Sequence, residues 1–250
     1  MQFFQTFGLD QSQWIILFIT ALTIGMSKTG VFGLSTVMFP VMAALFGGKI
    51  SAGVVLPMLI MADLFAVAYY RRHAEWKYLV KLVPWAFGGI LLGTLLGNYI
   101  DDQGFKVVMG VIILISVVIM VWRDVRRVTD IPDFWWFSMT MGVAAGFTSM
   151  VGNLAGSVTA LYLLSMRLPK NGFIGTGAWF FLLVNSLKVP FHVFSWETIT
   201  LGSFQLNLLM FPVIAIGALL GVKITAYLSD AFYRKFVIGV TLLSAGLLFW

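Results

Sequence analysis

Long apolar stretches dominate the chain, and most of them have the length of one membrane crossing. An α-helix needs about 20 apolar residues to cross a hydrocarbon core of about 30 Å. When their ends are read generously, the stretches that meet this requirement are Ile50–Tyr70, Leu79–Tyr99, Phe105–Trp122, Gly172–Val193, Ile199–Val222 and Phe232–Trp250. The intervals between apolar stretches are too short for a soluble domain. The pattern therefore predicts an all-α, polytopic membrane protein with one integral membrane domain.

Two further apolar stretches, Gln13–Gly47 and Phe134–Met166, do not fit a single helix. Each is too long for one crossing and short for two. Each is also interrupted near its middle by Gly, Ser, Thr or Asn. We interpret both as helix-break-helix hairpins, either re-entrant or made of two short crossings.

Composition agrees with this interpretation, and the basic residues add an orientation. The chain has 60% hydrophobic and 10% charged residues and no cysteine, so it has neither disulfides nor thiolate metal sites. An average soluble domain carries roughly 25% charged residues. Twelve of the 16 basic residues form four groups: Arg71, Arg72, Lys77 and Lys81; Arg123, Arg126 and Arg127; Arg167 and Lys170; Lys223, Arg234 and Lys235. If each hairpin returns to the side from which it entered, all four groups face the cytoplasm, and both termini lie outside.

The two halves of the chain, 1–127 and 128–250, share an order of features. Each has a broken hairpin, a link with a lysine, a long helix, a loop with a tryptophan and two more helices. Gly25 then corresponds to Gly146, and Asp63 to Asn185. Each half makes an odd number of net crossings, so the second half is inserted upside down. Inverted repeats with broken helices are typical of secondary transporters, although the shared order also fits the general pattern of helical membrane proteins.

Lys28 is the most informative residue. It is the only charged residue from Gln13 to Gly48, and an ammonium near the centre of a bilayer costs about 2.5 to 3.5 kcal/mol on insertion scales. The neighbouring Ser27, Thr29 and Gly30 add hydroxyls and a close backbone approach. Such a break also exposes helix-terminal amides, which suit an anion. The alternative is that the tip of the hairpin reaches the cytoplasmic headgroups, where a lysine is ordinary.

The second break, from Thr148 to Asn153, offers hydroxyls and an amide but no charge. We take Ser149 and Asn153 as its candidate ligands. If the two breaks meet at the interface between the halves, one cation and several neutral donors surround a single site. Such a site binds an oxyanion without holding it too tightly to release it.

The helix from Gly172 to Val193 supplies three more candidates: Thr176, Asn185 and Lys188. Lys188 lies about 24 Å from the start of the helix, so it either enters the site or snorkels to the outer surface. Asn185 and Thr176 are ligands or interhelical hydrogen-bond partners. His192, at the outer end of this helix, is expected to be solvated.

Asp63 is the carboxylate that lies deep in a predicted span. It neutralises Lys28 or Lys188, or it titrates and couples transport to protons, or it locks its helix through a salt bridge. The glycines at 89, 93 and 97 and at 217 and 221 are spaced for close helix packing. The sequence contains no metal-ligand cluster, no nucleophile with a base, no phosphate-binding loop and no dinucleotide fingerprint. We therefore predict that the protein is not an enzyme and has no cofactor and no metal.

Several of these segments together resemble a known family. They are Gly25-Met-Ser-Lys-Thr-Gly-Val-Phe-Gly33, Leu56-Pro57 followed by Asp63, Tyr70-Arg-Arg-His-Ala-Glu-Trp76, Ala145-Gly-Phe-Thr-Ser-Met-Val-Gly-Asn153, Leu168-Pro-Lys170, Thr176-Gly-Ala-Trp-Phe-Phe181 and Asn185-Ser-Leu-Lys-Val-Pro190. Over essentially the whole chain, the sequence resembles the sulfite exporter TauE/SafE family, also called the sulfonate uptake permease family. The resemblance implies inverted repeats that move sulfite, sulfonates or related organosulfur anions across the bacterial inner membrane. It also implies that Lys28 and the break from Thr148 to Asn153 lie at the substrate.

The sequence thus predicts a secondary transporter for a small sulfur-containing oxyanion that works by alternating access. Its partners would be that anion, membrane lipids, protons as a candidate coupling ion and a second copy in a candidate homodimer, with no nucleic acid. Two alternatives stay open. One is a carrier or channel for another small anion, such as a carboxylate, and the other is a non-transporting subunit that anchors a partner enzyme in the membrane.

Overall fold

The computed structural model describes residues 7–101 and 134–233, together with scattered positions within 103–122 and 235–239. Within these residues the chain is helical and forms no strand. Four helices are long and apolar enough to cross a membrane. They are α4 (Gly48–Tyr70), α5 (Trp76–Tyr99), α9 (Lys170–Pro190) and α10 (Leu201–Ala226). Four predicted spans are therefore confirmed to within a few residues, whereas Phe105–Trp122 and Phe232–Trp250 lie largely outside the described residues.

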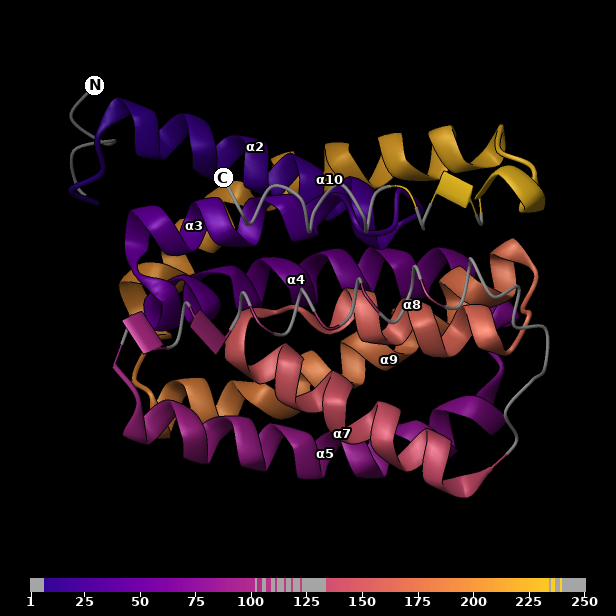
Figure 1. Cartoon of the computed structure of the whole chain (residues 1–250). Coiled ribbons are helices and arrows are strands. Elements are labelled where there is room, and N and C mark those ends of the chain that lie inside the picture. The colour runs from indigo at the N-terminus through magenta and orange to yellow at the C-terminus, as the bar shows by residue number, and fades with distance from the viewer. Residues whose placement is uncertain are drawn as a thin grey trace.

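Both long apolar stretches that we interpreted as hairpins are broken helices. The first consists of α2 (Gln11–Lys28), a short 3₁₀ turn η1 (Leu34–Val37) and α3 (Met38–Phe46). The second consists of α7 (Trp135–Gly152) and α8 (Ala155–Ser165). Each hairpin returns to the end of the molecule from which it entered (Figure 1).

Local sequence explains both breaks. In the first, Gly33 adopts a φ of 88° before η1, a conformation that glycine accepts without steric cost. In the second, Asn153 ends α7 with a φ of 59°, and asparagine is one of the few other residues that adopt this left-handed conformation. The amides of Asn153 and Leu154 bond back to the carbonyls of Ser149 and Thr148, so these polar groups are satisfied inside the protein.

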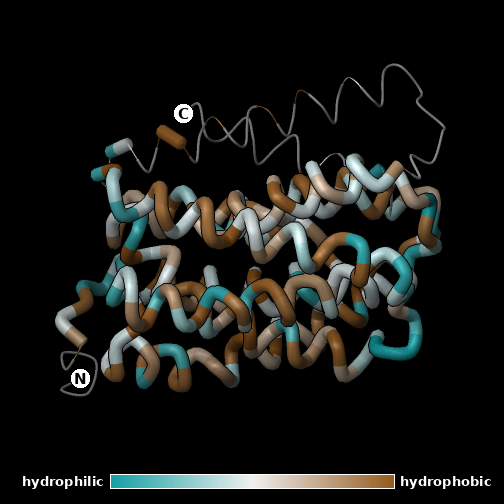
Figure 2. Tube along the Cα trace, turned by 90° about the horizontal axis from the view of Figure 1, so that it is seen from below, coloured by the Kyte–Doolittle hydropathy of each residue, from teal (hydrophilic) through white to brown (hydrophobic). Residues whose placement is uncertain are grey.

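The helices form three layers, with α4 and α9 at the centre. Figure 1 shows α2 and α10 along one side of this centre and α5 and α7 along the other. Along the tube in Figure 2, hydrophilic residues gather at the helix ends and hydrophobic residues occupy the lengths between them. Large apolar side chains on α5 and α10 are exposed, such as Leu95 at 55% and Leu219 at 70%. These two helices have the surface expected of lipid-facing helices.

Glycines let the outer helices pack with their backbones in contact. A Cβ atom on Gly25 of α2 would overlap the backbone of α10, and one on Gly217 of α10 would overlap the backbone of α2 at Leu22. On the other side, Gly89 of α5 and Gly146 of α7 stand in the same relation to each other's helices. Each hairpin thus packs against a long helix of the opposite half of the chain. The predicted role of these closely spaced glycines is confirmed.

Candidate functional site

The first break turns its lysine inward, onto a carboxylate of α4. The Nζ atom of Lys28 lies 2.9 Å from Oδ1 of Asp63. The amide of Asn185, on α9, donates a hydrogen bond of 2.7 Å to Oδ2 of the same carboxylate. Lys28 also lies over the ring of Phe181, with Nζ 3.8 Å from the ring centroid. Helices α2, α4 and α9 therefore meet at one polar contact.

The second break receives a lysine from α9. The ammonium of Lys188 donates to the carbonyl of Ser149 at 2.9 Å and to Oδ1 of Asn153 at 2.6 Å. The amide of Asn153 in turn donates to the carbonyl of Ala52, on α4, at 3.1 Å. Lys188 and Asn185 are three residues apart on α9, so they share one face of that helix. The two breaks are thereby linked through one polar cluster.

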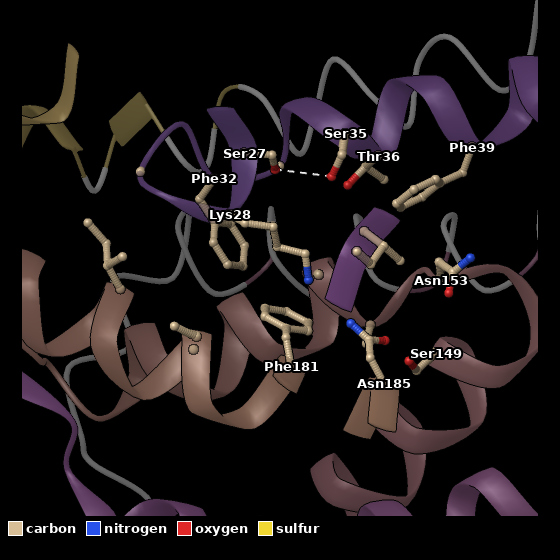
Figure 3. Close-up of a pocket in the computed structure, with 18 of the residues that line it drawn as sticks. Ser27, Lys28, Phe32, Ser35, Thr36, Phe39, Ser149, Asn153, Phe181 and Asn185 are labelled. Carbon is tan, nitrogen blue, oxygen red and sulfur yellow. Dashed lines mark hydrogen bonds between the residues drawn. The ribbon is translucent and has the colours of Figure 1, made fainter. Parts of the chain in front are cut away.

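A cavity of about 30 Å³ lies beside this cluster, between the two hairpins. Its polar lining residues are Ser27, Lys28, Ser35, Thr36, Ser149, Asn153, Asn185 and Tyr233, and its apolar lining includes Phe32, Phe39, Leu59, Ile174 and Phe181. The hydroxyl of Ser35 donates to that of Ser27 at 3.0 Å. In Figure 3 the Lys28 side chain extends between Phe181 and Asn185. The cavity has room for a water molecule or two, and it brings one cation together with several neutral hydrogen-bonding groups.

Most of the predicted site residues line this cavity. Ser27, Lys28, Gly30, Ser149, Asn153 and Asn185 do so. Asp63 and Lys188 are fully buried and lie in the cluster next to the cavity rather than in its lining.

Thr29 and Thr176 are directed elsewhere. The Thr29 hydroxyl lies within hydrogen-bonding distance of the carbonyls of Gly25 and, at 2.7 Å, Ala218, so it ties α2 to α10. The Thr176 hydroxyl accepts the backbone amide of Glu75 at 2.9 Å and holds the start of α5. Neither residue is among those that line the cavity.

The snorkelling alternative for Lys188 is excluded, and the expectation that His192 is solvated was wrong. Lys188 does not snorkel, because its side chain is 0% exposed and two acceptors on α7 hold its ammonium. His192 is not solvated either: it is 0% exposed, and its Nδ1 lies 2.8 Å from the hydroxyl of Thr198. His192 lies in the π-helical turn Phe191–Ser195 that follows α9, and it is the buried residue of that turn.

The first break lies off centre, although its lysine reaches the interior. Gly30 packs against Gly221 and Thr225, close to the end of α10 at Ala226. The tip of the first hairpin is thus nearer one end of the molecule, as the headgroup alternative requires. Lys28 itself points away from that end, and only 10% of its side chain is exposed. Its ammonium is therefore not in bulk solvent.

Among the lining residues that sequence reasoning missed are Ser35, Thr36, Gly156 and Tyr233. The first three follow a break by a few residues, and extending each candidate segment through the next turn would have found them. Tyr233 is separated from both breaks along the sequence, and only the folded chain brings it to the cavity. Among the described residues no group of His, Asp and Glu could hold a metal ion.

Comparison with protein families gives one match. The model of the family "Sulfite exporter TauE/SafE" matches residues 17–248, which is nearly the whole chain. Searches of curated proteins and of solved structures gave no match. The matched region contains both breaks, α4, α9 and the cavity between them. The chain therefore belongs to the sulfite exporter TauE/SafE family, a family of membrane transporters.

Proposed function

We propose that this protein is a secondary transporter for a small sulfur-containing oxyanion, such as sulfite or a simple sulfonate, and that the anion binds in the cavity beside Lys28. The observation that carries the proposal is the charge of the buried cluster. It contains two ammonium groups, Lys28 and Lys188, and one carboxylate, Asp63. With all three ionised, its net charge is +1.

A net positive charge in a buried cluster favours the binding of an anion. Lys188 has only neutral acceptors from Ser149 and Asn153, so Asp63 is the single carboxylate that the cluster offers to both lysines. An uncompensated charge in a low-dielectric interior is costly. A bound anion supplies the missing negative charge, which gives the site its sign selectivity.

The donors around the cavity suit the oxygens of an oxyanion. Hydroxyls of Ser27, Ser35 and Thr36 line it from one hairpin, and Asn153 lines it from the other. Hydrogen bonds from an ammonium to an anion are about twice as strong as neutral ones. Because Asp63 competes for the Lys28 ammonium, the anion is held firmly enough to be selected and loosely enough to leave.

Transport requires this cavity to change size and access. At about 30 Å³ it has room for a water molecule or two, so we take the described conformation as an occluded one in the proposed cycle. We assign the change to alternating access between two inverted repeats, 1–127 and 128–250. The packing supports these repeats, because α2 runs parallel to α10 as α7 runs parallel to α5, while α2 and α7 enter from opposite ends (Figure 1).

The orientation and the membrane belong to the same proposal. Arg71, Arg72, Arg167, Lys170 and Lys223 lie at one end of the molecule, where α4 and α8 end and α5 and α9 begin. By the positive-inside rule this end faces the cytoplasm of a bacterial inner membrane.

Asp63 is our candidate for gating or coupling. It bonds both halves, through Lys28 and Asn185. Protonation of its carboxyl would free the Lys28 ammonium for the anion, so a proton could travel with the substrate.

The test is uptake of sulfite, thiosulfate and a simple sulfonate into liposomes that contain the purified chain. Lys28→Met should lose more than about 90% of the initial rate, since a charge-assisted hydrogen bond of about 1.5 to 3 kcal/mol is removed. The matched control is Lys223→Met, which removes an exposed lysine at the end of α10 and should keep the parent's rate. Equal rates for Lys28→Met and the parent would refute the site.

A further inference from the structure

Tyr233 carries a buried hydroxyl whose purpose the fold does not explain. The residue is 2% exposed and lines the central cavity. Its hydroxyl has no hydrogen-bond partner within the described part of the chain. A buried hydroxyl without a partner costs about 1 to 3 kcal/mol. Such a group at a cavity wall is expected to have a partner in another state or with a ligand present.

Tyr233 also lines a second, larger hollow. This hollow of about 410 Å³ lies at the end of the molecule that carries Arg167 and Lys170. We call it the vestibule. Its polar lining comes from Arg167, Lys170 and Asp230, and Phe173 and Tyr233 form part of its wall. Among the described residues, Tyr233 is the one that the linings of the central cavity and the vestibule have in common.

A row of aromatic rings connects the lysine of the site to this tyrosine. Phe181, under the Lys28 ammonium, has its ring centroid 6.1 Å from that of Phe32. The Phe32 ring lies 5.1 Å from that of Phe173, which lies 5.8 Å from that of Tyr233. These separations are those of contacting aromatic pairs. The rings thus form a continuous apolar wall between the cavity and the vestibule.

We propose that Tyr233 is the gate between the central cavity and the vestibule, and that its hydroxyl donates a hydrogen bond to the oxyanion as the anion passes. This inference rests on the proposed function, since a gate presupposes a transported substrate. In the described conformation the ring would close the path between the central cavity and the vestibule, and the hydroxyl would gain its hydrogen-bond partner when the anion passes. The vestibule is then the mouth of the pathway at the basic end of the molecule.

The charges of the vestibule fit the entry or exit of an anion. Arg167 is exposed, whereas the Lys170 ammonium donates to the carbonyls of Thr225 and Leu228 and so fixes the end of α10 beside Tyr233. Asp230 offsets one of the two cations. The vestibule therefore carries a weak net positive charge, which attracts an anion but does not bind it tightly.

Closure by Tyr233 can be tested by accessibility, because the chain contains no cysteine. Ser35→Cys places one thiol in the lining of the central cavity. In nanodiscs, its reaction rate with the anionic reagent 2-sulfonatoethyl methanethiosulfonate is measured with and without Tyr233→Ala. We expect about a tenfold faster reaction with Tyr233→Ala, because removing a buried ring leaves a cavity that joins the two hollows.

The matched control is Tyr69→Ala in the same Ser35→Cys background. Tyr69 is 61% exposed and lines a neighbouring hollow at the same end, which shares no lining residue with the central cavity. It should leave the reaction rate unchanged. An unchanged rate with Tyr233→Ala, or an equal acceleration with Tyr69→Ala, overturns the gate.

The hydroxyl has its own test in Tyr233→Phe, which keeps the ring and is expected to fold as the parent does. The thiol should react at the parent's rate, while the KM for sulfite uptake should rise about tenfold, as expected for the loss of one hydrogen bond to a charged partner. An unchanged KM overturns the role of the hydroxyl. The accessibility result does not depend on sulfite being the substrate, so a protein that opens with Tyr233→Ala but moves no sulfite refutes the proposed function and leaves the gate standing.

Discussion

The ion pair between Lys28 and Asp63 gives the sharpest prediction. Its atoms are 2.9 Å apart, and the two side chains are 10% and 0% exposed. Removing one partner of a buried pair leaves the other charge uncompensated and costs about 3 to 5 kcal/mol. Replacing both partners by neutral groups of similar shape is often close to neutral.

We therefore expect Lys28→Met and Asp63→Asn each to lower the free energy of unfolding by about 3 to 5 kcal/mol. The double variant should lie within about 1 to 2 kcal/mol of the parent, which gives a large coupling energy in the double-mutant cycle. Asparagine at position 63 still accepts the hydrogen bond that Asn185 donates to Asp63. The double variant thus separates the loss of the cation from the loss of the fold.

The measurement is unfolding in mixed detergent micelles, repeated with and without sulfite. A ligand at a hundred times its Kd stabilises a protein by about 2.7 kcal/mol, and the parent should show a shift of that order. The double variant should be stable yet show no sulfite-dependent shift. A full shift in the double variant would refute the assignment of Lys28 to the anion, and single variants as stable as the parent would refute the buried pair.

An exposed ion pair in the same chain serves as the control for this cycle. Lys77 and Glu75 lie 3.9 Å apart, with 65% and 46% of their side chains exposed. Surface pairs of this kind contribute about 0 to 1 kcal/mol. Lys77→Met with Glu75→Gln should therefore change neither stability nor the sulfite shift, and a coupling energy as large as that of the buried pair would mean that the cycle does not report burial.

Three further predictions follow from the same contacts. Gly146→Ala should destabilise the protein by about 1 to 3 kcal/mol, because its Cβ would overlap the carbonyl of Ala86, whereas a Cβ on Gly88 meets nothing within 4 Å and Gly88→Ala should be harmless in the same unfolding assay. Asn185→Asp would place a second carboxyl beside Asp63, and the two would share a proton until a higher pH removes it and with it the net positive charge, so sulfite affinity measured by thermal shift should fall more than about tenfold as the pH is raised; an affinity that follows the parent's at every pH would contradict the charge argument. Asp63→Asn should make any sulfite uptake that remains insensitive to an imposed pH gradient, and uptake that still follows the gradient would exclude Asp63 as the proton carrier.

Much of the fold was predictable because the bilayer fixes the length of an apolar helix. The apolar stretches predict the starts and ends of α4, α5, α9 and α10 to within a few residues. Both breaks were predictable for the same reason, since neither long stretch matches a whole number of crossings. The depth of the first break in the membrane could not be predicted, because it depends on where along α10 the helix α2 packs. In the structure this position puts Gly30 against Gly221.

The site was predictable in its residues more than in its contacts. A lysine or an aspartate in an apolar stretch can be identified from the sequence as a site candidate, because burying its charge costs free energy. Lys28, Asp63 and Lys188 all belong to the cluster. The sequence did not predict which acceptor each lysine binds, because the partners lie 35 or more positions apart in the sequence. Thr29 and Thr176 show the converse, because a hydroxyl in a candidate segment can also join two parts of the fold.

The differences between the two halves allow the polar and charged groups of the cluster to find partners. Asp63 and Asn185, which the proposed repeat pairs with each other, stand in direct contact, with the amide donating to the carboxylate at 2.7 Å. Two aspartates at these positions would repel each other unless they shared a proton, and two asparagines would leave Lys28 without a countercharge. Position 28 carries the lysine in the first half, and the second half carries its own lysine on α9, where the carbonyl of Ser149 accepts from it. A symmetric pair of halves would not satisfy these groups at their shared interface, so the proposed anion site requires the proposed repeats to differ at these few positions.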